Sequence, residues 1–430
     1  MGTRRSVTSV GCSLHVHNIL DITNYFPFEL HKLTIQSLFM HVLSRGAIPI
    51  FGAGTIVGIF SSQLIKDLWF GVEEKPQVES PRIVHSVASP HYPQGAVLPS
   101  SNNVVVRGAF TTSLNYRTKT PDWVAELLTA QLVNGKNGDR KNSQFKSDED
   151  VPIRFRAKNK DYWDSGWSRG HLAASASHRH SQDGQDSTFL LNSNIVPQDM
   201  SMNGCDWNRL EVLVRDVTKE YGKTGKVFVL SGPAWVPETN TPFTQRPFSK
   251  NKVIMHEVVG DTEVHVPTHM FKVIRLQDAN SGLDASVAFL MPNRPIQNEQ
   301  PVESFKVSLE EVEKLTGLDL SGMRTSKDLC TVVRCEKPTN RRMLGWRHYG
   351  HIDEARDLEE LRTAVKNAID DGFVDGDNFL IPKAVKDRMH DLKIGDVAAL
   401  FPNDIKYQEA TQRGIDIFNR KNAESRPDDS

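Results

Sequence analysis

Apolar runs in the middle of the chain predict several strands. The run 227–230 ends at Ser231-Gly232-Pro233, which predicts a short strand followed by a turn. The segments 264–276 and 285–291 are also rich in β-branched and apolar residues, and we expect two further strands there.

Apolar residues at helical spacing predict three helices, at 121–132, 206–221 and 308–316. The third begins at Ser308 with Glu311 three residues later, the pattern of a capping box, and ends at Gly317. Strands and helices are interspersed without a βαβ period. The predicted fold class is therefore α+β, with a mixed or antiparallel sheet flanked by helices.

Residues 46–65 carry no charge and are long enough, at roughly 30 Å, to cross a bilayer core as a helix. Gly54 and Gly58 form a Gly-xxx-Gly step that permits close helix packing in lipid. We expect a membrane anchor at 46–68. A buried core helix or a signal-like segment is the alternative.

Four other segments differ in composition. Residues 1–45 form a leader that is mildly like a mitochondrial targeting segment. A Pro/Ser-rich linker is expected at 72–103, the body of the protein at 104–335, and a helical region with a polar tail at 336–430. Within that last region, 353–423 is charged and helical in pattern, with breaks expected at 371–372, 375–376 and 381–382.

Composition describes an ordinary globular protein of 430 residues, with 38% apolar residues, 24% charged residues and a net charge of -1. The whole-chain charge does not indicate a nucleic-acid partner. Between Arg140 and Arg179, however, Lys and Arg outnumber Asp and Glu. This stretch is either a basic patch that attracts phosphates or an ordinary solvated face.

The four cysteines are too few and too scattered for a disulfide framework or a zinc site. Cys330 and Cys335 are expected to be reduced and packed, with a local disulfide as the alternative.

Candidate chemistry is concentrated in Ser168-Arg169-Gly170-His171 and the segments that follow it. A neutral imidazole at His171 can accept a proton near neutral pH. Arg169 offers a guanidinium fork that matches phosphate oxygens, and Gly170 permits a close approach of backbone and substrate. His178 and His180 are interpreted as loop histidines without a catalytic role.

Asn203 and Glu211 suit a hard metal ion that keeps most of its water ligands. Eight helical residues separate side chains by about 80° around the axis and roughly 12 Å along it. Glu211 is therefore expected to hold a metal-bound water rather than to share direct ligation with Asn203. Trp207, Leu210 and the valines that follow provide a buried stripe that would fix this helix.

The joint pattern resembles the DNA/RNA non-specific endonuclease family, which has a ββα-metal core, and in particular its mitochondrial exo/endonuclease G branch. The resemblance covers about 220 residues. The motifs that carry it are Asp161-Tyr162, Ser165-Gly-Trp-Ser-Arg-Gly-His171, Asn194-Ile-Val-Pro-Gln-Asp199, Trp207-Asn-Arg-Leu-Glu211, Leu230-Ser-Gly-Pro233 and Phe305-Lys-Val-Ser-Leu309. The region after Cys335 is similar, more loosely, to the helical wing of that branch.

The resemblance implies a role for each matching residue. His171 would be the general base, Asn203 the direct Mg²⁺ ligand (Mn²⁺ substituting) and Glu211 the holder of a metal-bound water. Asn194 would support the site, with Gln198 shaping the same turn. Arg169 and Arg140 would hold the phosphate.

Ser168 stands where the wider family has Asp, and serine is typical of the exonuclease-like branch. The resemblance thus implies 5′-to-3′ exonuclease and endonuclease activity on DNA, with RNA as a further substrate. It also implies 5′-phosphate and 3′-hydroxyl products, a homodimer at the mitochondrial inner membrane, and a role in mitochondrial DNA repair or turnover. Two alternatives stay open: a sugar-non-specific endonuclease of the endonuclease G type, and a membrane-anchored nucleic-acid-binding protein without activity.

Overall fold

The computed structural model describes residues 89–238, 251–296, 298–373 and 380–424. The predicted leader, the candidate anchor at 46–68 and the first part of the linker lie outside these ranges. Within the described ranges, no helix has the length and apolar character needed to cross a membrane. The predicted boundaries at 104 and 335 remain predictions.

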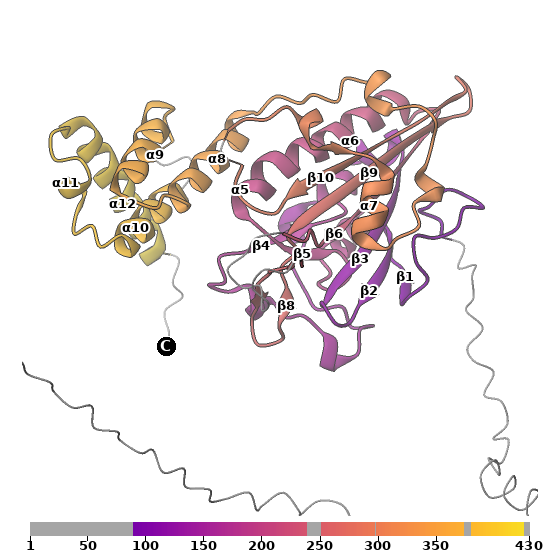
Figure 1. Ribbon diagram of the computed structural model, residues 1–430, viewed down its shortest axis with the longest axis horizontal. Helices are drawn as coiled ribbons and strands as arrows, with labels where there is room; N and C mark the ends of the chain where they lie inside the picture. Colours follow the sequence, from indigo (N-terminus) through magenta and orange to yellow (C-terminus); the bar gives the residue numbers. More distant parts are fainter. Residues whose placement is uncertain (1–88, 239–250, 297, 374–379, 425–430) are drawn as a thin grey trace, which may run out of the picture. The chain divides into compact units, whose positions relative to one another are not determined.

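A seven-stranded antiparallel sheet forms the centre of the fold, in the order β1-β2-β3-β6-β9-β10-β11 (Figure 1). Its strands are β1 Val104–Val106, β2 Thr111–Asn115, β3 Thr120–Leu128, β6 Lys226–Ala234, β9 His269–Asp278, β10 Leu283–Pro292 and β11 Lys306–Val307. A two-residue pair, β7 Val258–Val259 with β8 Val264–His265, lies outside this sheet.

Both faces of the sheet are buried, and each is covered by a different helix. Alternate residues of β6 point to opposite faces: Val227 and Val229 join one core cluster with α6 (Asn208–Tyr221), whereas Phe228 and Leu230 join another with α7 (Leu309–Thr316). Burial on both faces explains why the central strands read as continuous apolar runs.

The chain between β3 and β6 is built from short elements that carry the candidate chemistry. In order they are α3 Ala130–Val133, η1 Arg140–Asn142, η2 Ile153–Phe155, η3 Asn159–Tyr162, β4 Ser168–His171, η4 Ser175–Ser177, α4 Gln182–Ser187, β5 Ile195–Gln198, α5 Met200–Met202, the π-helix η5 Asn203–Trp207, and α6.

After β10 come η6 Val302–Phe305, α7, η7 Ser321–Met323 and η8 Leu329–Thr331. The C-terminal helical region (α8–α12) then has an apolar core of its own. Its helices are α8 Arg341–Asp353, α9 Leu358–Asp370, α10 Leu380–Asp391, α11 Val397–Leu400 and α12 Ile405–Glu424.

The α+β class is confirmed, as are the helices at 206–221 and 308–316 and the strand at 285–291. Ser308 Oγ accepts a hydrogen bond from Glu311 N at 3.1 Å, and Gly317 closes α7 with φ of +73°. These ends follow the N-cap and C-cap signals in the sequence.

The helix predicted at 121–132 is wrong, because most of this segment is β3 and only Ala130–Val133 is helical. Trp123 and Val124 are both fully buried, and they face opposite core clusters. A strand buried on both faces has no polar side, so its apolar positions can imitate helical spacing.

The turn predicted at 231–233 is also wrong, because β6 continues to Ala234. Pairing with β3 ends at Ser231, so Pro233 is not required to donate a hydrogen bond on that side. The single strand predicted at 264–276 is instead β8 followed by β9.

Of the three breaks predicted in the C-terminal helical region, the one at 371–372 follows the end of α9 as predicted. The one at 381–382 is wrong, because Pro382 lies within α10 and does not break it. The one at 375–376 lies outside the described residues.

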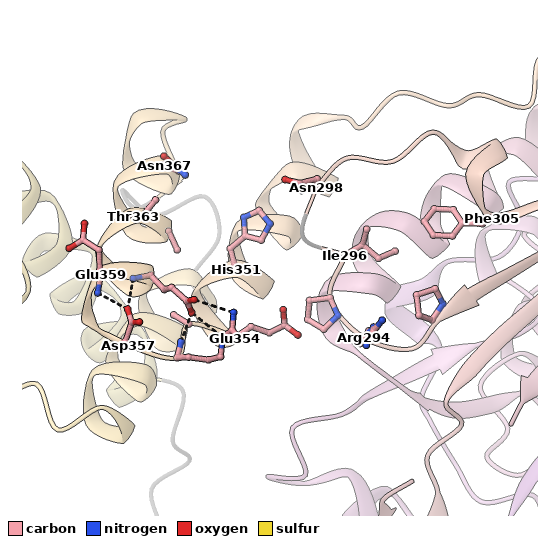
Figure 2. A pocket seen from close by; sticks show the side chains of 16 residues that line it. Arg294, Ile296, Asn298, Phe305, His351, Glu354, Asp357, Glu359, Thr363 and Asn367 are labelled. Carbon is pink, nitrogen blue, oxygen red and sulfur yellow. Dashed lines mark hydrogen bonds and ion pairs between the residues drawn. The ribbon is translucent and has the colours of Figure 1, made fainter. Parts of the chain in front are cut away.

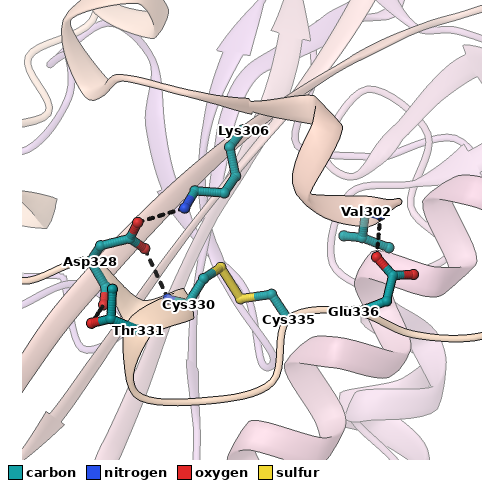
Figure 3. The surroundings of a disulfide bond; sticks show 7 residues. All are labelled: Val302, Lys306, Asp328, Cys330, Thr331, Cys335 and Glu336. Carbon is teal, nitrogen blue, oxygen red and sulfur yellow. Dashed lines mark hydrogen bonds and ion pairs between the residues drawn. A yellow bond between two sulfur atoms is a disulfide. The ribbon is translucent and has the colours of Figure 1, made fainter. Parts of the chain in front are cut away.

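Cys330 and Cys335 form a disulfide, which corrects the expectation of two reduced thiols (Figure 3). Asp328 accepts from Cys330 N at 2.9 Å and from Lys306 Nζ at 2.5 Å, which fixes the start of the loop. Glu336, directly after the second cysteine, accepts from Val302 N at 2.8 Å. Cys330 lies within the short turn η8, and the Cα atoms of the two cysteines are 5.3 Å apart, within bridging range.

Candidate active site

The antiparallel pair β4–β5 carries the central motif. Ser168 pairs with Gln198 and His171 with Ile195, so the two ends of the motif are fixed by backbone hydrogen bonding. Ser168 Oγ donates to Gln198 O at 2.7 Å, which adds a side-chain tie at the open end of the pair.

His171 lies at the buried end of β4 and is 8% exposed. Its Nε2 atom is buried and has no hydrogen-bond partner among the described residues. Burial, with smaller contributions from the positive charges of Arg140 and Arg169, lowers the pKa of His171 to about 3. The imidazole is therefore neutral at physiological pH and able to accept a proton.

Two phenylalanines that sequence reasoning missed form an aromatic floor beneath the motif. Phe145 and Phe189 meet edge to face at 4.8 Å, and the His171 ring contacts both, at 5.4 and 4.8 Å between centroids. The Arg169 guanidinium lies 4.3 Å from the Phe145 centroid, and that of Arg140 lies 5.3 Å from the Phe189 centroid. The floor thus places one arginine on each phenylalanine and the imidazole between them.

The arginines are also held by hydrogen bonds. Arg169 Nη1 donates to Asn159 Oδ1 at 3.0 Å, and Arg140 Nη1 donates to Ser175 Oγ at 3.1 Å. Partial burial lowers the pKa of both guanidinium groups. The loop containing Arg140 shows the weakest sequence match, yet the structure brings this residue to the site.

Asn203 is the first residue of η5, directly after α5. Its Nδ2 donates to Ser168 Oγ at 3.0 Å, so the amide is oriented by the residue that opens the central motif. The carbonyl oxygen Oδ1 is the remaining polar atom of this side chain. π-Helical turns are rare and occur frequently at functional sites.

Glu211 lies in the first turn of α6, and its side chain is 17% exposed. Burial raises the pKa of this carboxyl, while the charges of Arg215, Lys272 and Arg140 oppose the rise. Arg215, one helical turn further on, lies 3.7 Å away. Trp207, Leu210, Val214 and Val217 are buried as the predicted stripe requires.

Lys272, in the middle of β9, is a buried cation that sequence reasoning missed. Its Nζ donates to Ser231 Oγ at 2.5 Å and to Leu172 O at 3.2 Å. It also lies 4.6 Å from the centre of the Trp207 ring. Lys272 therefore connects the sheet to the residue after His171 and to the last residue of η5; its sequence signal is a lysine inside an apolar strand.

Asn194 is completely buried, and its amide is fully used within the protein. Oδ1 accepts from Ala173 N at 2.8 Å, while Nδ2 donates to Ala173 O at 2.9 Å and to Thr188 O at 2.8 Å. These bonds fix the chain that leaves β4. Asn194 is therefore placed to position His171 rather than to touch a substrate.

The close neighbour of Gly170 is a protein side chain, which corrects the expected reason for this glycine. A Cβ at Gly170 would lie 2.0 Å from Gln198 Oε1. Gln198 is completely buried, and its amide atoms have no partner among the described residues. Gly170 thus makes room for Gln198, which packs across the β4–β5 pair.

His178 lies in the loop after η4, as expected, but it is buried. It is 1% exposed, and its Nε2 lies 2.7 Å from Oε1 of the equally buried Glu126 in β3. His180 is partly exposed, as a loop residue would be.

Arg209, within the Trp207–Glu211 motif, is also internal: it binds Asp206, Glu336 and the carbonyl oxygens of Gln300 and Lys337.

The donor set around Asn203 fits a hard divalent cation. The amide of Asn203 and the carboxylate of Glu211 both offer oxygen, and Mg²⁺ commonly takes one or two such ligands and keeps its waters. Among the described residues, no group of three or more His, Cys, Asp or Glu forms a metal cage. A site built from one amide, water and phosphate does not require such a cage.

Two cavities border the C-terminal helical region. One of about 1000 Å³ separates the segment after β10 from α8 and α9. Figure 2 shows Arg294, Ile296 and Phe305 on one wall, facing Asp357 and Glu359 on the other. Both signs of charge line it, and none of the candidate catalytic side chains does.

Taken together, the fold and site define a hydrolase of the ββα-metal nuclease class. The model of the DNA/RNA non-specific endonuclease family matches residues 87–323, and the chain belongs to this family. The protein is thus a nuclease.

Curated relatives extend the match. Mouse "Nuclease EXOG, mitochondrial" is 30% identical over 81% of this chain and 93% of its own length. The Xenopus laevis protein of the same name is 34% identical over 63% of this chain and 73% of its own. Human "Endonuclease G, mitochondrial" is 36% identical over 51% of this chain and 70% of its own.

Proposed function

We propose that this protein is a Mg²⁺-dependent nuclease that hydrolyses phosphodiester bonds of DNA, and also of RNA, leaving 5′-phosphate and 3′-hydroxyl ends. The observation that carries the proposal is His171, a neutral imidazole with an unpartnered Nε2, set between two arginines on one aromatic floor. A proton acceptor flanked by two guanidinium groups that can bind phosphate oxygens suits in-line attack of water on phosphorus.

The residues of the chain divide the chemistry as follows. His171 accepts the proton of the attacking water. Arg169 and Arg140 bind non-bridging phosphate oxygens and stabilise the charge that develops there. Asn194 and Lys272 hold the backbone of Ala173 and Leu172, directly after His171, which fixes the direction of the imidazole.

Asn203 would hold the metal ion directly, and Glu211 would orient one of its waters. The ion supplies Lewis-acid neutralisation of the phosphate and the leaving oxygen. Mn²⁺, with the same preference for oxygen ligands, is proposed to substitute for Mg²⁺.

His171→Asn tests the assignment of the base. Asparagine keeps a polar side chain at the site, but its amide cannot accept the proton of the attacking water. We expect cleavage of a plasmid to fall by at least 100-fold, with an unchanged circular dichroism spectrum. His390→Asn, which alters an exposed histidine of α10, is the matched control. A residual rate above about a tenth of wild type would contradict the assignment.

We further propose 5′-to-3′ exonuclease activity beside the endonuclease activity. Linear duplexes labelled at the 5′ or the 3′ end, compared with closed circles, distinguish it from an endonuclease G type of activity. Rapid nicking of circles without loss from 5′ ends would favour an endonuclease G type of activity.

Ser168→Asp tests the serine itself: an unchanged ratio of exonuclease to endonuclease activity would remove Ser168 from this argument. Binding of DNA without metal-stimulated cleavage would favour an inactive binding protein.

The proposed setting is the mitochondrial inner membrane, where the protein would act as a homodimer in DNA repair or turnover. The word "mitochondrial" in the names of the relatives and the uncharged segment 46–65 support this setting. Carbonate extraction of mitochondria that contain the tagged full chain tests the anchor, and light scattering of the detergent-solubilised protein tests the dimer. Release by carbonate, or a monomer mass, would contradict the respective proposal.

A further inference from the structure

One face of α8 packs against the turn that carries Asn203. A Cβ at Gly204, the residue after Asn203, would lie 2.2 Å from Cγ of Trp346 in α8. One helical turn further along α8, a Cβ at Gly350 would lie 2.5 Å from Oγ of Ser201 in α5. Two glycines, one on each side of the contact, therefore allow the helices to approach closely.

A buried charge network lies beside this contact. Arg347 Nη2 donates to Asp206 Oδ1 at 3.1 Å and to Cys205 Sγ at 3.2 Å. Asp206 is 1% exposed and also accepts from Arg209 at 3.0 Å. A buried carboxylate shared by two arginines fixes the geometry of the backbone that carries it.

Three consecutive residues of η5, Gly204 to Asp206, are thus contacted by α8. On the other side, Ser168 binds the amide of Asn203. π-Helical turns are rare and occur mostly as single turns beside α-helices, so contacts on both sides of η5 are a notable feature of this site. We propose that α8 is a positioning element of the metal site: Trp346 and Arg347 hold η5 so that Asn203 presents its carbonyl oxygen to the ion.

This inference rests on the proposed role of Asn203, so the experiment measures metal binding directly. Free Mn²⁺ is followed by electron paramagnetic resonance during titration of the full-length protein, without nucleic acid. Asn203→Ala is expected to abolish the site. Trp346→Ala is expected to raise the Kd for Mn²⁺ about 10-fold, the lower end of the effects seen for groups that orient ligands. Cleavage by Trp346→Ala should recover at saturating metal.

Tyr407→Ala is the matched control. Tyr407 is an aromatic residue of the C-terminal helical region that packs on Phe401 and binds Asp370, both residues of that same region. The Mn²⁺ affinity of the Tyr407→Ala variant should equal that of the wild-type protein. If Trp346→Ala fails to fold, Trp346→Phe and Arg347→Lys provide milder changes at the same contact, for which we expect smaller increases in Kd.

A bump-and-hole pair sharpens the test. Gly204→Ala alone should weaken Mn²⁺ binding, because its methyl group meets the indole. Gly204→Ala combined with Trp346→Ala should bind no more weakly than Trp346→Ala alone. Loss of the site in Asn203→Ala with unchanged affinity in the Trp346 and Arg347 variants would overturn the role of α8. Unchanged affinity in Asn203→Ala would instead contradict the proposed ligand.

Discussion

At the scale of single residues, a hydroxyl group decides which end of an amide is presented to the site. Ser168 Oγ donates to Gln198 O and accepts from Asn203 Nδ2. With its hydrogen committed to the carbonyl, the hydroxyl can only accept from Asn203, so the NH₂ group must point toward it. The oxygen of Asn203 is then the atom left for a cation.

Ser168→Ala should therefore increase the Mg²⁺ concentration needed for half-maximal cleavage. Loss of one neutral hydrogen bond costs about 1 kcal/mol, which corresponds to about a fivefold change. Ser165→Ala is the control, since Ser165 Oγ also donates to a carbonyl, that of Tyr162, but does not contact Asn203. Equal Mg²⁺ requirements in the two variants would show that the hydroxyl does not orient the ligand.

A second prediction at this scale concerns the ionisation of His171. Its pKa is lowered to about 3, mainly by burial, so the proton-accepting form is present throughout the range from pH 8 to 5. An ordinary histidine would lose this form below about pH 6.5. The imidazole carbon shifts of His171, measured by NMR in the metal-free protein, should stay constant down to pH 5. A midpoint near 6.5 would contradict the assigned environment.

The same shift affects folding stability. Because the unfolded chain binds a proton at His171 near pH 6.5 and the native state does not, this residue contributes stability above pH 6.5. That contribution is lost as the pH falls toward the folded pKa of about 3. His91, whose pKa burial lowers to about 4, acts in the same direction.

At the scale of elements, the β4–β5 pair is held at the spacing that the side chain of Gln198 requires. Gly170→Ala places a methyl group 2.0 Å from Gln198 Oε1 and should destabilise the protein by about 1–3 kcal/mol, the usual cost of overpacking. Gln198→Ala in the same chain removes the obstacle. The double variant should be more stable in urea than the sum of the single effects, and strict additivity would mean that the two side chains do not meet.

Sequence pattern predicted the amphipathic elements and missed those buried on two sides. α6 has one apolar stripe and is followed by Gly222, so 206–221 is recognisable. β3 is buried on both faces and imitates a helix. The disulfide was equally hidden, because spacing alone does not show that Cys330, within η8, lies in bridging range of Cys335.

The candidate site shows the same contrast between features that a local sequence pattern indicates and features that it misses. Local motifs indicated His171, Arg169, Asn203 and Glu211. The residues that support them come from other segments: Phe145 and Phe189 from two separate loops and Lys272 from a strand about 100 residues away. Only the folded chain brings these together, since a contact between distant segments leaves no periodic signal in the sequence.

At the scale of the whole molecule, α8 links the core of the C-terminal helical region to η5. Ile352 packs in the core of the C-terminal helical region, whereas Trp346 and Arg347 contact η5. The network of Arg347, Asp206 and Arg209 is buried, and Arg209 continues it to the chain around Gln300 and Lys337. Such a network couples the unfolding of the two parts, because opening either side breaks buried charge-assisted hydrogen bonds.

The described part of the chain should consequently unfold in one calorimetric transition, and Arg347→Ala should separate it into two. Removing the guanidinium eliminates its hydrogen bond to Asp206 while Arg209 still neutralises the carboxylate, so the expected loss is about 1.5–3 kcal/mol. The nuclease core, with its own sheet, should remain folded after the C-terminal helices melt. Arg388→Ala, which removes ion pairs with Asp353 and Asp391 inside the C-terminal helical region, should lower that region's stability without splitting the transition. If Arg347→Ala also unfolds in a single step, the coupling resides in apolar contacts such as that of Trp346, and Trp346→Ala should then produce the two transitions.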